Sequence, residues 1–258
     1  MYRGRRIAVV IPAFNEERAV AAVVRSVPRF VDHVVVVDDA STDHTARAVR
    51  RGRRRGLELL CHPANRGVGA AIESGYRRAL ALGCDIAAVM AGDGQMDPLD
   101  LPALLDAVVD GRCDYAKGNR FARPGTLRAM PAIRIVGNVV LSLLTKLTSG
   151  YLFVFDSQCG YTAASRSALE VIDRAGLFPR YGYPNDLLAR LWAERLTVAD
   201  VPVRAVYGRE WKSGIGLGTV VYPMSFVLLG SLLRRLSHRY LSLRTHARGG
   251  LPVSDDAA

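Results

Sequence analysis

Short apolar runs rich in β-branched residues recur through the first half of the chain, and a segment with helical spacing follows most of them. The runs are Ile7–Ile11, Val34–Val37, Leu57–Cys61 and Ile86–Met90. Uninterrupted Val and Ile are typical of strands that are buried on both faces of a sheet. Strands that alternate with helices at this period predict an α/β fold, a mostly parallel sheet flanked by helices.

Helical apolar spacing predicts four helices that accompany these strands, at Glu16–Val27, His44–Arg51, Gly67–Leu82 and Leu99–Asp110. The second half of the chain is less regular. Its predicted elements are two helices and one strand, at Ile133–Leu147, Leu187–Glu194 and within Val198–Val206. We expect one α/β domain over residues 1–216, an apolar and basic C-terminal segment over 217–247, and a disordered tail over 248–258.

The chain is strongly basic, with a formal net charge of +11 and a pI of about 9.9. This charge favours phosphate-bearing substrates, an anionic membrane or nucleic acid as partners. Nucleic acid is the remotest of these alternatives, because no helix-turn-helix, RNA-recognition or zinc signature accompanies the arginine-rich run at 50–55. Four isolated cysteines, no signal sequence and no stretch long enough to span a bilayer lead us to expect a cytoplasmic protein.

Polar segments follow the predicted strands, and Asp93 is the most informative residue among them. It lies directly after a buried strand, in a turn between Gly92 and Gly94, with Gln95 two residues further on. Such a turn can present Asp93 and Gln95 to one hard cation, Mg²⁺ or Mn²⁺, which prefers oxygen ligands. The alternative is an aspartate that only caps its own turn. Other acidic segments expected at the same edge of the sheet favour the metal.

Three further carboxylates have two interpretations each. Asp38 and Asp39 end the second strand, where one can cap the next helix and the other can accept hydrogen bonds from a base or a ribose. Glu16 is either a first-turn helix carboxylate or a contact to the nucleoside.

Four motifs resemble, in order and spacing, the family 2 glycosyltransferases of the GT-A fold. They are Val10–Glu17, Val37–Asp43, Asn65–Gly67 and Gly92–Pro98. The likeness runs from about residue 7 to residue 216 and is closest to the dolichol-phosphate-mannose-synthase-like branch, which moves a sugar to a polyprenyl phosphate. It implies an inverting transferase that uses a UDP or GDP sugar and Mg²⁺ or Mn²⁺.

The resemblance also implies roles for individual residues. The nucleoside pocket would be lined by Pro12, Phe14, Glu16 and Asp39, and the metal would be held by Asp93 and Gln95. The segment 118–121 resembles the one whose arginine, here Arg120, contacts phosphate, and 156–161 resembles the acceptor-side motif. One position departs from the family, because Ala91 stands where the first acid of an Asp-x-Asp motif is usual.

The nature of the acceptor decides which further groups are needed. A hydroxyl of a soluble or cell-envelope acceptor requires a general base, for which Asp186 and Asp156 are the candidates. A phosphate acceptor is already an anion near pH 7 and needs cations instead. Arginines suited to that purpose occupy one stretch of the chain, namely Arg120, Arg123, Arg128 and Arg134.

Two apolar segments bear on where the acceptor lies. Ile133–Leu147 and Val220–Leu233 are too short to span a bilayer, and basic residues follow the second one. This pattern suits a helix at an anionic membrane surface, so we expect a peripheral location at the cytoplasmic face. A buried packing helix or a homodimer helix is the alternative.

Overall fold

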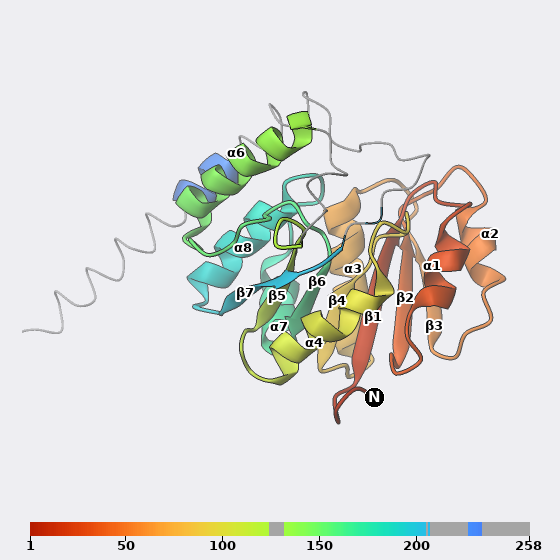
Figure 1. Cartoon of the computed structure of the whole chain (residues 1–258). Coiled ribbons are helices and arrows are strands. Elements are labelled where there is room, and N and C mark those ends of the chain that lie inside the picture. Colours follow the sequence, from red (N-terminus) through yellow and green to blue (C-terminus); the bar gives the residue numbers. More distant parts are fainter. Residues whose placement is uncertain (124–131, 205, 207–226, 234–258) are drawn as a thin grey trace, which may run out of the picture.

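A computed structural model describes residues 1–123, 132–204, 206 and 227–233 of the chain (Figure 1). Its centre is a seven-stranded sheet with the order β3-β2-β1-β4-β6-β5-β7. The strands are β1 (Ile7–Ala13), β2 (His33–Asp38), β3 (Leu57–Cys61), β4 (Ile86–Val89), β5 (Tyr115–Asn119), β6 (Thr162–Ser165) and β7 (Val198–Pro202).

All strand pairs are parallel except those of β6, which runs antiparallel to both β4 and β5. In the sheet, β2 and β3 lie on one side of β1, and β4 lies on the other side. The predicted α/β fold with a mostly parallel sheet is therefore confirmed. This topology makes the gap between β1 and β4 a switch point, where ligands of open α/β sheets bind beyond the strand ends.

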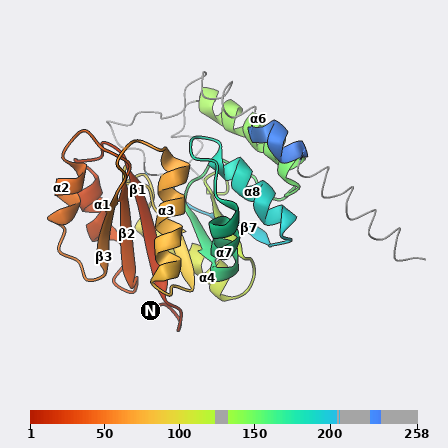
Figure 2. The same cartoon turned by 180° about the vertical axis from the view of Figure 1, so that it is seen from behind.

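Helices cover both faces of the sheet (Figures 1 and 2). One face carries α1 (Val20–Ser26), α2 (Thr45–Arg50) and α4 (Leu101–Val109), and the other carries α3 (Val68–Ala81), α7 (Arg166–Ala175) and α8 (Tyr183–Ala193).

The central strand β1 feeds both cores in alternation. Ile7, Val9 and Ile11 pack with α1 and α4, whereas Ala8 and Val10 pack with α3 and α7. All five residues are completely buried. This burial explains the unbroken apolar sequence, because a strand covered on both faces has no position left for a polar side chain.

Helix α6 (Ala132–Ser149) lies across the end of the molecule toward which the parallel strands point, and a short helix at 227–233 lies beside it (Figures 1 and 2). Helix α6 contacts the domain through a hydrogen bond that Thr145 Oγ1 donates to Asn185 Oδ1 of α8 at 2.7 Å. Within the described ranges, none of the helices has the length and apolar character that crossing a membrane requires.

Several element boundaries differ from those predicted. The helix expected from Glu16 begins only at Val20, because residues 16–19 form a turn in which the Glu16 carbonyl accepts from the Ala19 and Val20 amides. The helix expected from Leu99 is preceded by the 3-10 turn η1 (Pro98–Asp100). Helix α8 begins at Tyr183, four residues before the predicted start, and β7 ends at Pro202.

Three elements were not predicted at all, namely β5, β6 and α7. The expected segment Val220–Leu233 is helical over 227–233, and its earlier residues lie outside the described part of the chain. The expected tail over 248–258 and most of the segment over 217–247 lie outside it as well.

Candidate active site

The segments that follow β1, β2 and β4 meet at one edge of the sheet, because these three parallel strands are neighbours in the order β2-β1-β4. Backbone contacts tie them together. The Asp39 amide donates to the Ala13 carbonyl at 2.9 Å, and the Gly92 amide donates to the Pro12 carbonyl at 3.2 Å. The acidic segments predicted to share one rim of the sheet are thus brought together.

The loop after β1 is fastened to the loop after β2 by Asn15. This residue adopts a left-handed backbone with φ of 57°, a conformation that asparagine tolerates better than most residues. Its Oδ1 accepts from the Thr42 amide at 2.8 Å, and its own amide donates to Ser41 Oγ at 2.9 Å. The next amide, that of Glu16, donates to Thr45 Oγ1 at 2.7 Å. Glu16 is therefore held by its backbone while its carboxylate remains available.

Asp39 has both carboxylate oxygens engaged within the protein. Oδ1 accepts from the Arg66 amide at 2.9 Å and lies 2.6 Å from His62 Nδ1, while Oδ2 accepts from the Gly67 amide at 2.7 Å. The residue is only 3 % exposed. Asp39 thus organises the wall of the expected nucleoside pocket by fixing the loop before α3.

Asp38, its neighbour, is also buried and has a local role. Its Oδ1 accepts from the Ser41 amide at 3.1 Å, which closes the turn after β2. Pro12 and Phe14 are the other residues expected at the pocket. Pro12 is the penultimate residue of β1, and Phe14 directly follows the strand with an exposed side chain. An exposed aromatic ring beside this wall is available for stacking on a base.

Asp93 lies in the turn after β4, at the switch point. The chain passes close to β1 at Gly92, where a Cβ atom would lie 3.1 Å from the Pro12 carbonyl oxygen, a tight contact that favours glycine. Asp93 Oδ1 accepts from the Gln95 amide at 3.0 Å, which leaves Oδ2 for a ligand. The side chain is open on one side, yet the protein packed around it removes enough water to raise the pKa of Asp93.

Glu16 faces Asp93 across the switch point. Burial, with added repulsion from the charges of Asp93 and Asp43, raises the pKa of Glu16 to about 7. Burial, with the charges of Asp93 and Glu16, raises the pKa of Tyr181. Tyr181 precedes α8 and was not predicted, because a single tyrosine in a loop has no sequence signal that connects it to β1 and β4.

The arrangement of these oxygens suits a hard divalent cation that is shared with substrate phosphates. No group of three His, Cys, Asp or Glu side chains that would hold a metal unaided occurs in the described ranges. The free oxygen of Asp93 and the mutual repulsion of two nearby carboxylates nevertheless fit a cation. Mg²⁺ in particular keeps several water and phosphate ligands and needs only one or two carboxylates from the protein.

A second polar cluster follows β5. Arg120 donates to Asp156 through two atoms, Nε to Oδ2 at 2.7 Å and Nη2 to Oδ1 at 2.9 Å, and its amide also donates to Oδ2. Asp156 is fully buried, so its charge is compensated by this fork rather than by water. Beneath the pair, the buried Lys117 donates from Nζ to the Cys159 carbonyl at 2.6 Å, which anchors the acceptor-side motif.

Asp186 lies inside the protein, in the first turn of α8. Its Oδ2 accepts from the Phe178 amide at 2.9 Å and from Arg190 Nε at 2.8 Å. These bonds hold the loop that carries Tyr181 against the helix. Of the predicted phosphate-binding arginines, Arg123 pairs with Asp100 at 3.1 Å. Arg128 and the side chain of Arg134 lie outside the described residues.

An open α/β sheet with interacting carboxylates at its switch point is the arrangement expected of a glycosyltransferase of the GT-A type, with a ligand site beyond the ends of β1 and β4. Comparison with known families matches residues 8–172 to the family described as Glycosyl transferase family 2. The chain belongs to that family and is a glycosyltransferase.

Two characterised relatives are similar over most of the chain. The UDP-N-acetylglucosamine–dolichyl-phosphate N-acetylglucosaminyltransferase of Methanococcus voltae is 31 % identical over 247 residues, which cover 88 % of this chain and 98 % of the relative. The polyprenol monophosphomannose synthase of Mycolicibacterium smegmatis is 30 % identical over 205 residues, 77 % of each chain.

Among solved structures, glucosyl-3-phosphoglycerate synthase from Mycobacterium tuberculosis in complex with Mn²⁺, UDP and glucosyl-3-phosphoglycerate has a TM-score of 0.66 at 25 % identity. The match covers 90 % of this chain and 80 % of that one. The fold predicted from the sequence and the observed sheet are therefore those of a GT-A glycosyltransferase.

Proposed function

We propose that this glycosyltransferase moves a sugar from a nucleoside diphosphate sugar to a polyprenyl phosphate, with inversion at the anomeric carbon. The observation that carries the donor half is the pair of facing carboxylates, Glu16 and Asp93, at the switch point beside the nucleoside wall. The acceptor half is supported by two relatives whose names specify dolichyl phosphate and polyprenol monophosphomannose, each matched over most of this chain.

The donor site is assigned as follows. Pro12, Phe14 and the wall held by Asp38 and Asp39 receive the nucleoside. We favour uridine over guanosine, because the Methanococcus relative is named for a UDP sugar and the solved neighbour contains UDP. Asp93 and Gln95 would hold Mg²⁺ or Mn²⁺, with Glu16 opposite. A divalent cation bound there supplies compensation for the charge that develops on the leaving diphosphate.

The chemistry at the acceptor follows from the charges of the second cluster. A phosphate monoester has a second pKa of about 6, so its oxygen is nucleophilic near pH 7 without a base. That oxygen forms the new bond to the anomeric carbon while the bond from this carbon to the donor diphosphate breaks. Arg120 and Arg123 lie beside the acceptor-side motif and supply positive charge. Arg134 is proposed from the sequence to join them.

The environments of the two candidate bases support a phosphate acceptor over a hydroxyl. Asp156 is held by the Arg120 fork and Asp186 by Arg190, both at hydrogen-bond distance and with the carboxylates buried. Arginine and amide hydrogen bonds engage each of these carboxylates within the protein, which leaves them poorly placed to contact an acceptor hydroxyl. We propose that Asp156 positions the Arg120 guanidinium. We propose that Asp186 positions the loop that contains Tyr181.

The outer face of α6 is proposed to contact the bilayer that contains the polyprenyl chain. Apolar side chains on it are 41–63 % exposed, namely Val139, Val140, Leu143, Leu144 and Leu147. Leu152, Phe153 and Phe155 follow, also exposed, and Lys146 lies with Nζ 3.6 Å from the centre of the Phe155 ring. A lysine above an apolar strip suits the headgroup level of a membrane. A homodimer through the same face is the alternative occupant.

The donor proposal is tested by thermal-shift binding to UDP, GDP, ADP and CDP, with and without Mn²⁺. We expect UDP with Mn²⁺ to raise the melting temperature most. Stabilisation by GDP alone would reverse the choice of nucleoside, and the absence of stabilisation by all four would overturn the donor site.

The acceptor proposal is tested by sugar transfer to a short-chain polyprenyl phosphate and to the corresponding alcohol. We expect product only from the phosphate. Asp186→Asn should retain most of the rate constant in a variant that stays folded. Complete loss of transfer with unchanged donor binding would instead favour the hydroxyl alternative with Asp186 as base.

Membrane contact is tested by flotation of the full chain with anionic vesicles. Leu143→Ser combined with Leu147→Ser should reduce the bound fraction several-fold. Leu99→Ser, at an exposed leucine of η1 away from α6, should not. Two results together would make the outer face of α6 a dimer interface. Both variants would float like the original chain, and sedimentation would show a dimer that only the double variant disrupts.

A further inference from the structure

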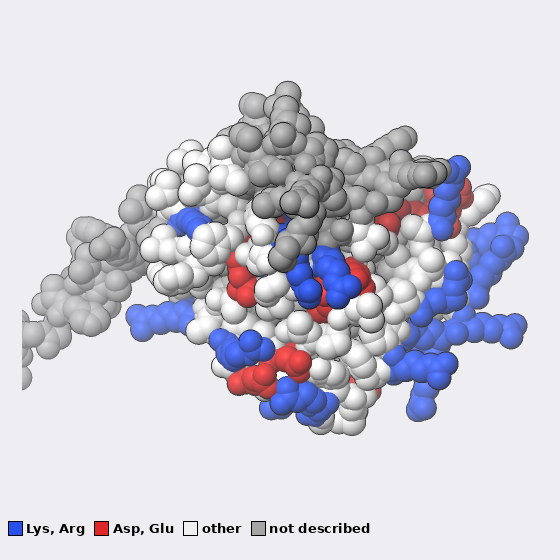
Figure 3. Space-filling view, in the orientation of Figure 1, with Lys and Arg blue, Asp and Glu red and all other residues white. Residues whose placement is uncertain are grey.

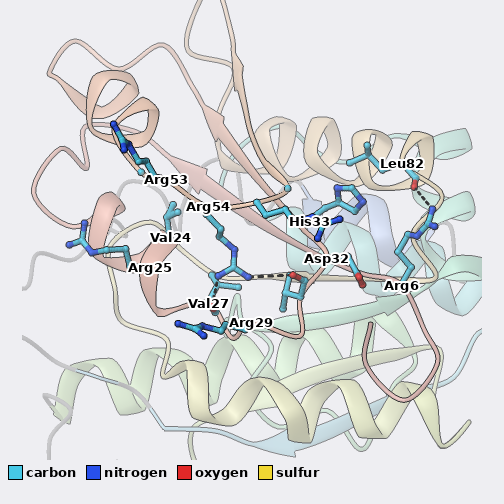
Figure 4. Close-up of a pocket in the computed structure, with 14 residues that line it drawn as sticks. Arg6, Val24, Arg25, Val27, Arg29, Asp32, His33, Arg53, Arg54 and Leu82 are labelled. Atoms are coloured by element: carbon cyan, nitrogen blue, oxygen red, sulfur yellow. Dashed lines mark hydrogen bonds between the residues drawn. The ribbon is translucent and has the colours of Figure 1, made fainter.

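The opposite end of the sheet carries a second, strongly basic hollow that the transferase site does not use. It has a volume of about 930 Å³ and lies at the amino ends of β1, β2 and β3, beside the ends of α1 and α2 (Figure 4). Six arginines line it, namely Arg6, Arg25, Arg29, Arg53, Arg54 and Arg55. Figure 3 shows basic side chains gathered along the same edge of the molecule, where α1, α2 and β3 lie.

Arg54 holds together the two loops that form this hollow, and we call it the brace. Its Nη1 donates to the Val27 carbonyl at 2.5 Å and its Nη2 to the Pro28 carbonyl at 2.8 Å, the carbonyls that follow α1. The α2–β3 loop is thereby tied to the α1–β2 loop. Burial lowers the pKa of Arg54, as expected for a guanidinium committed to neutral carbonyls.

Gly56 fixes the same loop from its other end. It has a φ of 71°, and a Cβ atom built on it would lie 2.1 Å from the Asp32 carbonyl oxygen, so only glycine fits there. Its own carbonyl accepts from the Val34 amide at 2.8 Å. The arginines on either side of Arg54 are therefore held on a fixed loop rather than on a free one.

The arginines around Arg54 have no acidic partner among the residues that the structure describes. Within the described ranges, no carboxylate lies at ion-pair distance from Arg25, Arg29, Arg53 or Arg55. The one acid of the hollow, Asp32, is bound to the N-terminal ammonium at 2.8 Å and to the Ile7 amide at 2.8 Å.

Some arginines elsewhere on the surface do have an acidic partner. Arg77 pairs with Asp173 at 2.8 Å, and Arg166 pairs with Glu170 at 3.0 Å. A cluster of like charges without counter-charges repels itself, and an anion in its midst removes that repulsion.

We propose that this hollow binds a soluble oligophosphate, a small anion with several phosphate groups such as inorganic triphosphate or the triphosphate of a nucleotide. Guanidinium groups match phosphate oxygens through two parallel hydrogen bonds, and several of them converge here. The volume is that of a small-molecule site. A bilayer is not the source of the phosphates, because α6 and its apolar face lie at the other end of the strands (Figure 1).

The test is calorimetric binding of inorganic triphosphate to the full chain at fixed ionic strength with EDTA present. The variant Arg25→Gln/Arg29→Gln/Arg53→Gln leaves the Arg54 brace intact. We expect it to weaken triphosphate binding at least about tenfold, the factor that follows from losing one charge-assisted hydrogen bond. The control Arg77→Gln/Arg166→Gln/Arg78→Gln removes the same charge from paired positions and should bind as the original chain does.

Two readouts separate this site from the donor site and from nucleic acid. UDP binding with Mn²⁺ should be the same in both triple variants, and both should keep the circular dichroism of the original chain. Equal triphosphate affinity in the two variants would overturn the proposal. A random single-stranded oligonucleotide that displaces triphosphate and binds more tightly would also overturn it, in favour of a nucleic-acid surface.

Discussion

At the scale of single residues, the proposed donor site draws its carboxylates from the ends of two strands. Ala91 occupies the position of the first family acid, so Asp93 after β4 is joined by Glu16 after β1 rather than by a neighbour in its own turn. The charge of Asp93 raises the pKa of Glu16 when no cation is present. We expect a divalent cation and a diphosphate bound at the proposed site to favour the ionised form of Glu16.

Asp93→Asn should abolish most of the transfer activity while the protein remains folded. The amide keeps the hydrogen bond to the Gln95 amide but has no charge for a cation, so we expect the rate to fall at least about 100-fold. Initial rates of sugar transfer measure this. Asp173→Asn, at an exposed acid of α7, serves as the control and should stay within about twofold of the original rate.

Glu16→Gln should change stability in a pH-dependent way. A carboxyl whose pKa rises from 4.5 to about 7 on folding favours the folded state fully below the unfolded value, and this contribution is lost as the pH rises through 7. Because the neutral amide avoids that loss, the variant without ligand should be more stable than the original at pH 8 by about 1 kcal/mol, allowing for solvent screening. At pH 4 the two should unfold alike. Urea titrations at both pH values measure the difference, and an equal difference at both would contradict a shifted Glu16.

The sequence predicts candidate site residues where they lie in ordered motifs, and it gives no signal for neighbouring residues that come from elsewhere in the fold. Asp93 and Glu16 follow predicted strands, so topology alone places them at one edge. Tyr181 and Lys117 arrive from a loop and a strand of the irregular second half. Their positions depend on tertiary pairing, which no local pattern encodes.

At the scale of elements, β5 illustrates why a buried strand can escape prediction. Its five residues are all buried, yet Lys117 and Asn119 are polar. Each is satisfied by a distant partner, Lys117 by the Cys159 carbonyl and Asn119 by Asp200 at 2.8 Å. An apolar pattern therefore never forms in the sequence, whereas β1 and β4 are recognisable because all their residues are apolar.

Arg120→Gln should destabilise the fold rather than only slow catalysis. The substitution leaves the fully buried Asp156 without its compensating charge, and breaking such a pair costs about 3–5 kcal/mol. Equilibrium urea denaturation measures the loss. The control Arg166→Gln breaks a pair that is exposed on both sides and should cost less than about 1 kcal/mol. Equal costs for the two variants would contradict a buried role for the Arg120–Asp156 pair.

At the scale of the whole molecule, the two proposed sites lie at opposite ends of the strands. The carboxyl ends carry the donor site and lie nearest the apolar face of α6, whereas the amino ends carry the arginine-lined hollow (Figures 1 and 4). A molecule that rests on a bilayer through α6 would expose the hollow to the aqueous side. The net charge of +11 is then explained in part by an anion site and not only by a general attraction to membranes.

The reversed strand β6 has a consequence for how the chain folds during synthesis. It pairs with β4, yet it begins about 70 residues after β4 ends. At a ribosomal speed of ~5–20 residues per second, the edge of β4 waits roughly 4–15 s for its partner. An unpaired strand edge is a template for association with other chains during that interval. Slower translation lengthens the wait, so the aggregated fraction on expression should depend on elongation rate across residues 90–165.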